Sequence, residues 1–188
     1  MFSSDIQKTH LHSYHKETLK AKMAPFAGYD MPVQYEGIIK EHLHCREHAG
    51  LFDVSHMGQV NVTGKDAQAF LERAFVADVQ ALGKGKATLS LLMNEKGGIM
   101  DDCIITKDEE EKYFVVLNAG CKYKDLDHLK ALREGEFAKK DVSINYFETH
   151  SLVAVQGPKA AGLVENLVGQ SLIDMDFMTS AHFSYKGE

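Results

Sequence analysis

Apolar positions recur with two different periods along the chain, and each period predicts a type of element. Residues 59–64 alternate, with Val60 and Val62 on one side, as in a half-buried strand. Within residues 65–75, apolar side chains recur instead at i, i+3, i+4, i+7 and i+8, and this spacing predicts an amphipathic helix. Its apolar face consists of Ala67, Phe70, Leu71, Ala74 and Phe75. A shorter helix with a polar outer face is expected over residues 36–48.

Three strand-like runs follow one another at residues 87–94, 99–106 and 113–118. The sequence Glu-Lys-Gly-Gly at residues 95–98 is typical of a hairpin turn. The charged residues 107–112 form the expected second turn. The simplest arrangement is a three-stranded antiparallel meander.

Helices and strands are interspersed in the last third of the chain. A helix is expected over residues 121–134, and a strand over residues 151–157 that runs into Pro158. Proline suits the first turn of a helix, so a further helix is expected to begin there and to end at Gly169. Antiparallel strands with interspersed helices predict an α+β fold.

Two adjacent aspartates interrupt the second run of the meander. Side chains alternate along a strand, so Asp101 and Asp102 must point to opposite faces of the sheet. The length of the following turn places Asp102 across from Leu117 or Asn118, and in the second register Asp102 and Asn118 are direct neighbours. The preceding turn places Asp102 near Leu89 or Leu91.

A carboxylate and an amide on an otherwise apolar sheet face would make a polar anchor at the bottom of a ligand pocket. A solvated strand end is the alternative, because adjacent aspartates near a turn are common on protein surfaces. These residues alone leave both interpretations open.

Composition excludes several classes of protein. The hydrophobic fraction of 44% and the charged fraction of 26% are those of an ordinary globular protein. A formal net charge of -6 without a basic cluster argues against a nucleic-acid partner. Three cysteines without C-x-x-C spacing favour a reducing compartment, and no apolar run has the roughly 20 residues that a membrane helix needs. The first 23 residues lack the features of a secretion signal or a transit peptide.

Other clusters of reactive side chains are interpreted as structural. His42, His44, Cys45 and His48 lie on one predicted helix, but a solvated helix face is preferred to a metal site there, so no metal is expected. Asp53, Ser55 and His56 are too close in sequence to converge as a catalytic triad. Cys103 has no basic neighbour and is expected to be an inert small apolar residue.

Five segments in register resemble the T-protein, the aminomethyltransferase of the glycine cleavage system. They are FAGYDMPVQY (26–35), GLFDVSHMGQ (50–59), NEKGGIMDDCIIT (94–106), VVLNAG (115–120) and VAVQGP (153–158). The resemblance implies a three-lobed fold around folate. It also implies transfer of one carbon from the aminomethyl-lipoyl arm of H-protein to tetrahydrofolate, with release of ammonia. Carried over by position, Asp102 matches the essential aspartate beside the reacting folate nitrogens, and Met57, Leu89 and Asn118 match pocket-lining positions.

The resemblance covers about half of a family member. The family's Arg-x-Gly-Tyr-Thr-Gly-Glu segment and C-terminal barrel domain are not found, so residues 1–188 are expected to be an incomplete N-terminal part that is inactive alone. The last alternating segment, residues 177–188, has no later strand to pair with, which supports this expectation. By the same resemblance, localisation would be the mitochondrial matrix in a eukaryote and the cytoplasm in a bacterium.

Three alternatives remain at this stage. One is a non-enzymatic folate-binding relative, and another is the folate domain of a sarcosine- or dimethylglycine-type oxidase. The third is a small-molecule binding module without chemistry. The segment Gly97–Asp102 favours the transferase over the first of these.

Overall fold

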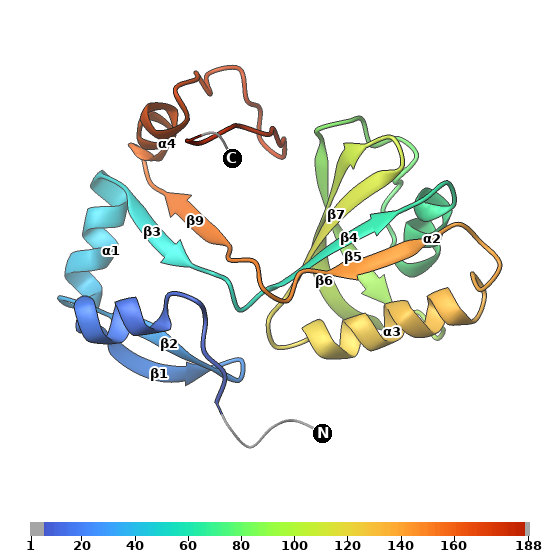
Figure 1. Cartoon of the computed structure of the whole chain (residues 1–188), viewed down its shortest axis with the longest axis horizontal. Helices are drawn as coiled ribbons and strands as arrows, with labels where there is room; N and C mark the ends of the chain where they lie inside the picture. Colours follow the sequence, from blue (N-terminus) through green and yellow to red (C-terminus); the bar gives the residue numbers. More distant parts are fainter. Residues whose placement is uncertain (1–5, 187–188) are drawn as a thin grey trace. The chain divides into compact units, whose positions relative to one another are not determined.

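The computed structural model describes residues 6–186, which form two compact units (Figure 1). The first unit contains residues 6–56, 151–174 and 183–186, and the second contains residues 57–150 and 175–182. Both combine helices with antiparallel strand pairs, which confirms the expected α+β class. No helix among the described residues is long and apolar enough to span a membrane.

A five-stranded antiparallel sheet is the centre of the second unit. Its strands, in spatial order, are β5 (Ala87–Met93), β6 (Ile99–Glu109), β7 (Lys112–Leu117), β4 (Gly58–Thr63) and β8 (Ser143–Tyr146). The predicted meander is therefore confirmed. The predicted strand β4 joins it at the far side of β7, and β8, which the sequence pattern did not reveal, completes the sheet.

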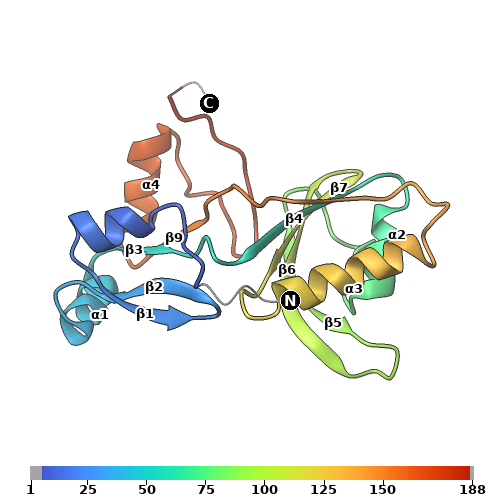
Figure 2. The ribbon, with the colours of Figure 1, turned by 60° about the horizontal axis from the view of Figure 1, so that its bottom comes forward.

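Two helices, α2 (Ala67–Ala74) and α3 (Lys122–Glu134), cover one face of this sheet (Figures 1 and 2). The five apolar positions predicted for the first helix are at most 3% exposed. They pack with Leu126 and Leu129 of α3 against the inward side chains of the strands. Burying one such large apolar side chain stabilises a fold by about 1.5–3 kcal/mol, so this layer holds the sheet in shape.

The charged turn expected at residues 107–112 is shorter than predicted. Strand β6 continues to Glu109 and β7 begins at Lys112, with an irregular register between Lys107 and Glu109. Lys107 is only 9% exposed, and its ammonium group lies 3.2 Å from a carboxylate oxygen of Glu110. The long aliphatic part of a lysine can cover apolar surface while its charge stays paired, which explains why charge alone did not mark a turn here.

The junction between β4 and α2 requires glycine. Gly64 has a φ of +117°, and a Cβ atom there would lie 2.1 Å from the carbonyl oxygen of Asp141. The neighbouring backbone is fixed as well, because the amides of Lys65 and Asp66 donate to the Asp141 side chain and carbonyl respectively.

Gly64→Ala is expected to lower the free energy of unfolding by about 2–3 kcal/mol, because it combines backbone strain with a backbone clash. Gly97→Ala is the matched control, since Gly97 also has a positive φ, +76°, but a Cβ atom there would have no other atom within 4 Å. Its cost should be about 1 kcal/mol. Urea denaturation of both variants checks this, and equal losses would mean that the clash relaxes without cost.

The first unit has two small sheets with helices between them along the chain. A short π-helix at Tyr14–Thr18 precedes the pair β1 (Lys22–Phe26) and β2 (Tyr29–Gln34); α1 (Ile38–Glu47) follows, and β3 (Gly50–Asp53) pairs with β9 (Val153–Gln156). Helix α4 (Ala160–Val168) comes last. The predictions of α1, β9 and α4 are confirmed, whereas β1, β2 and β3 were not predicted.

The predicted end of α4 is correct, but its predicted start is not. Gly169 has a φ of +70° and its amide donates to the Glu165 carbonyl, which is a left-handed helix end. The helix begins at Ala160 after Lys159, so Pro158 precedes its first turn.

Residues 177–186 do not form the strand that their alternation suggested, and residues 187–188 lie outside the described residues. Part of this segment does pair within the second unit. The amide of Ala87 donates to the Met178 carbonyl, and the amide of Ser180 donates to the Gly85 carbonyl. The segment thus pairs with residues that precede it in the chain, whereas the sequence expectation concerned only a strand that follows it.

Candidate functional site

Asp102 and Asn118 lie together at one end of the meander. Cys103 pairs with Leu117 across β6 and β7, so the next residues along, Asp102 and Asn118, are neighbours in the second of the two predicted registers. The side-chain amide nitrogen of Asn118 lies 3.0 Å from both the Oδ1 atom and the backbone oxygen of Asp102, and donates to them. The predicted antiparallel meander with these two side chains together is confirmed.

Apolar residues surround this polar pair on the outer face of the sheet. Leu91 pairs with Asp102, while Leu89 pairs with Ile104 two positions further along the strands. Leu89 is 61% exposed and Ile104 is 39% exposed, although both are large apolar side chains. Continuing the β4–β7 register by one residue places Met57 opposite Asn118. The four predicted site positions, Met57, Leu89, Asp102 and Asn118, therefore share one half-exposed face, with a carboxylate at the end of an apolar patch.

Asp101 faces the other side of the sheet, as alternation predicts, but it is connected to the same amide. The Asn118 amide nitrogen lies 3.2 Å from Oδ1 of Asp101. One asparagine thus bridges both aspartates. Strand alternation by itself would leave Asp101 with little influence on a site around Asp102, but this contact connects the two.

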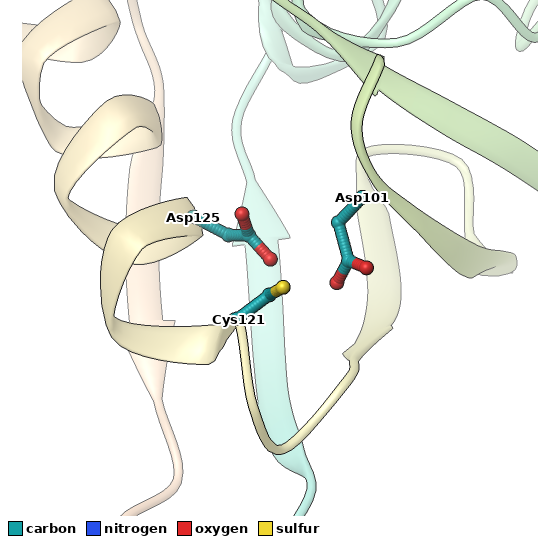
Figure 3. Close-up of side chains that lie close together, drawn as sticks. All are labelled: Asp101, Cys121 and Asp125. Carbon is teal, nitrogen blue, oxygen red and sulfur yellow. The ribbon is translucent and has the colours of Figure 1, made fainter.

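A second carboxylate and a thiol lie against Asp101 beneath the sheet. Figure 3 shows the side chains of Asp101 from β6 and of Cys121 and Asp125 from the start of α3 pointing toward one another. Each offers one oxygen or sulfur atom, and these three atoms lie within 4.8 Å of one another. Burial, followed by the effect of the neighbouring Asp101 carboxylate, raises the pKa of Asp125 to about 7, against the opposing effect of Lys124.

Asn118 also fixes the helix that carries these groups. It is the first residue after β7, and its carbonyl accepts hydrogen bonds from the amides of Cys121 and Lys122. The amide of Asp125 then donates to the Cys121 carbonyl in the first turn of α3. A tight strand-to-helix connection therefore sets the positions of Asn118, Cys121 and Asp125 together.

The three clusters interpreted as structural behave differently from one another. His44 and His48 lie one helical turn apart, with ring centroids separated by 4.9 Å. Among residues 6–186, however, the group of three side chains close enough to ligate a metal ion together is Asp101, Cys121 and Asp125 beneath the sheet. Asp53 accepts from Ser55 and lies 3.1 Å from His15. The ring of His56 packs against the aromatic rings of Phe26 and Tyr29.

Cys103 is buried at 4% exposure, in agreement with its predicted apolar role. Burial, followed by the charges of Asp101, Asp102 and Asp125, raises the pKa of its thiol to about 12. The thiol is therefore neutral and unreactive at ordinary pH.

The first unit contains a separate cleft of about 640 Å³ between β2, α1 and β3. Tyr35 and Asp53 line it, and both contact the buried His15: the Tyr35 hydroxyl lies 2.8 Å from Nδ1. Burial raises the pKa of Asp53, but hydrogen bonds from Ser55 and His15 outweigh it and leave the pKa below its ordinary value. Buried side chains in such a network fix the packing of the short strands around the cleft.

Sequence reasoning missed Asp125 and Cys121 as neighbours of the aspartate pair. A signal was available, because Lys122, Asp125, Leu126 and Leu129 follow i, i+3, i+4, i+7 spacing and all four are buried. A carboxylate on the apolar face of a helix is costly to bury, so it indicates that another group in the fold compensates it. Only the fold could show that Asp101 is what it meets.

Comparisons with known proteins confirm the family that the five motifs resemble. The family model described as "GCVT N-terminal domain" matches residues 11–188. The chain belongs to this family. Among curated relatives it is 46% identical to the mitochondrial aminomethyltransferase of Dictyostelium discoideum, over 98% of this chain and 47% of that protein. It is 43% identical to the aminomethyltransferase of Chloroherpeton thalassium, over 96% of this chain and 48% of that protein.

A solved structure of the same family has the same fold. The glycine cleavage system aminomethyltransferase T from Bartonella henselae superimposes with a TM-score of 0.85 at 37% sequence identity. The match covers 93% of this chain and 47% of that one. This GCVT N-terminal domain therefore spans about half the length of the relatives that it matches.

Proposed function

We propose that the chain provides the folate-facing part of a glycine cleavage aminomethyltransferase. The reaction would move one carbon from the aminomethyl-lipoyl arm of H-protein to tetrahydrofolate, releasing ammonia and leaving 5,10-methylenetetrahydrofolate and the reduced dihydrolipoyl arm. The observation that carries the proposal is the Asp102–Asn118 pair at the edge of an exposed apolar sheet face. The names of the relatives support the same activity.

Asp102 suits the chemistry of this reaction. A folate amine must attack a methylene carbon while ammonia leaves, so positive charge develops on nitrogen. A fixed carboxylate stabilises that charge, most strongly once the bound substrates exclude water. Asn118 orients the carboxylate through a hydrogen bond to Oδ1, which leaves Oδ2 for the substrate. Leu89 and Met57 would pack against the flat ring system of the folate.

Further residues would complete the pocket. We propose that these belong to a second part of the kind that the relatives contain beyond the matched half, including the glutamate and arginines that the resemblance assigns to the pterin ring and the glutamyl tail. The site would then work without a metal, and the protein would act in the mitochondrial matrix of a eukaryote or in the cytoplasm of a bacterium. The partners would be tetrahydrofolate and lipoylated H-protein.

The test compares the 188-residue chain with a chimera in which it is followed by the C-terminal half of the Dictyostelium discoideum relative. Ammonia release from aminomethyl-loaded H-protein in the presence of tetrahydrofolate is measured for both. We expect turnover by the chimera and none by the chain alone, because the pocket residues proposed for the second part are present only in the chimera. Turnover by the chain alone would refute the proposal that the pocket is shared between this chain and a second part. Folate binding by the chimera without ammonia release would favour a binding module without chemistry.

A further inference from the structure

Three carboxylate oxygens beneath the sheet are buried without a hydrogen-bond donor. They are Oδ2 of Asp101 and both oxygens of Asp125, whose side chain is fully buried. An ionised carboxylate can only accept hydrogen bonds, whereas a protonated one also donates one. Two ionised carboxylates held this close in a buried place would repel each other and lack compensation. The arrangement therefore requires a donor that the protein atoms do not otherwise supply.

The charged and titratable groups around this pair do not provide full compensation. Lys124 from α3 is half-exposed, and its ammonium group lies 3.7 Å from Oδ1 of Asp125 but 2.6 Å from the Met100 carbonyl, to which it donates. Cys121, also on the α3 side, contributes a thiol, which is a weak donor at best. Cys103 from β6 is a neutral buried thiol. On the β7 side, Asn118 donates to the other oxygen of Asp101.

We propose that Asp101 and Asp125 share one proton, and that this pair of carboxyl groups positions Asn118 and, through it, Asp102. The proton is carried by Asp125 and donated to Oδ2 of Asp101. Asp101 stays ionised and accepts a hydrogen bond from the Asn118 amide through Oδ1. A continuous series of hydrogen bonds then runs from Asp125 through Asp101 and Asn118 to Asp102. The link to transfer chemistry rests on the proposed function, but the shared proton does not.

The pKa of Asp125, raised to about 7 chiefly by burial and then by Asp101, agrees with this arrangement. This pKa sets the direction in which folding stability changes with pH. An unfolded aspartate loses its proton near pH 3.9, so between about pH 4 and pH 7 the folded chain holds more protons than the unfolded one. The stability that the shared proton contributes is fully present at the acidic end of this window. It falls as pH rises and is lost above about pH 7.

The experiment observes the Asn118 side-chain amide by nitrogen–proton NMR in the 188-residue chain, with the signal assigned by its loss in Asn118→Leu. In the unsubstituted chain we expect this signal to shift with a midpoint near pH 7. In Asp125→Asn the shift should disappear, because the new amide donates permanently to Asp101 without titrating. Asp125→Ala removes the donor altogether and should displace the signal at every pH. Asp127→Asn, an exposed neighbour on the same helix, should titrate like the unsubstituted chain.

Thermal unfolding gives a second readout that does not depend on the NMR assignment. The melting temperature of Asp125→Asn relative to the unsubstituted chain should rise from pH 5 to pH 7 and become constant above pH 8. A constant difference, or an Asn118 signal that does not titrate near pH 7, would overturn the shared proton. Strong stabilisation by zinc that a chelator reverses would also overturn it, because a cation would then occupy the place of the proton. None of these results depends on transfer activity, so a failure here is distinct from a failure of the proposed function.

Discussion

Asp102→Asn is expected to lower the rate of one-carbon transfer about hundredfold to thousandfold in a chimera that contains this chain. The substitution keeps the size of the side chain and can keep the hydrogen bond with Asn118, but it removes the charge that would face the substrate. Losing one well-placed electrostatic group typically costs about 3–4 kcal/mol of barrier. Folate affinity should fall much less than the rate, because the charge matters most when the amine becomes cationic. Steady-state kinetics with aminomethyl-loaded H-protein checks both quantities.

Asp127→Asn is the matched control, since it makes the same chemical change at an exposed position of α3 in the same unit. Its rate should equal that of the unsubstituted chimera. Circular dichroism would establish that both variants fold. A fully active Asp102→Asn would show that the carboxylate is not the group that stabilises the transition state.

Strand alternation alone would predict that neutralising Asp101 has almost no effect on transfer, but the contacts of its side chain indicate otherwise. It points away from Asp102 but accepts from the same amide and lies against Asp125. Asp101→Asn should therefore reduce transfer, although less than Asp102→Asn, since it acts only through the position of Asn118. Equal losses for the two variants would leave no reason to single out Asp102.

The sequence predicted elements best where one period extended over several turns or strands. The apolar face of α2 followed from spacing alone, whereas turn length narrowed the register of the meander to two choices, between which the structure decides. Strands β1, β2, β3 and β8 were missed because they have four to six residues each, and Pro25 interrupts the first. Such short strands form because the rest of the unit supplies their partners, which no local pattern reveals.

The same limit applies to the site. Alternation along β6 was enough to separate Asp101 from Asp102, and turn length offered Asn118 as one of two possible neighbours of Asp102, which the structure selects. It could not show that one amide reaches both carboxylates, because Asn118 lies just beyond the end of β7, where strand geometry no longer applies. The contact with Asp125 depends on how α3 packs beneath the sheet, so it is a property of the fold.

Asn118→Leu is expected to lower transfer about hundredfold, with a loss of about 1–3 kcal/mol in the free energy of unfolding. Leucine has a similar size but cannot donate a hydrogen bond. The Oδ1 atoms of Asp101 and Asp102 would therefore lose the hydrogen bonds that they accept from Asn118. Without the amide between them, the two carboxylates also lose the group that offsets their repulsion. Asp127→Asn again serves as the control, because it changes an exposed side chain of α3 away from this sheet face. Kinetics and urea denaturation of both variants measure the two effects.

A double-mutant cycle decides whether Asn118 acts through Asp102 or by itself. If the amide serves to orient the carboxylate, Asn118→Leu should cost little further rate once Asp102 is already asparagine, because the charge to be oriented is gone. Full additivity of the two losses would instead mean that Asn118 contacts the substrate independently. A wild-type rate for Asn118→Leu alone would show that Asp102 is held by something other than this amide. The cycle thus separates a positioning role from direct substrate binding, which the hydrogen bond by itself does not distinguish.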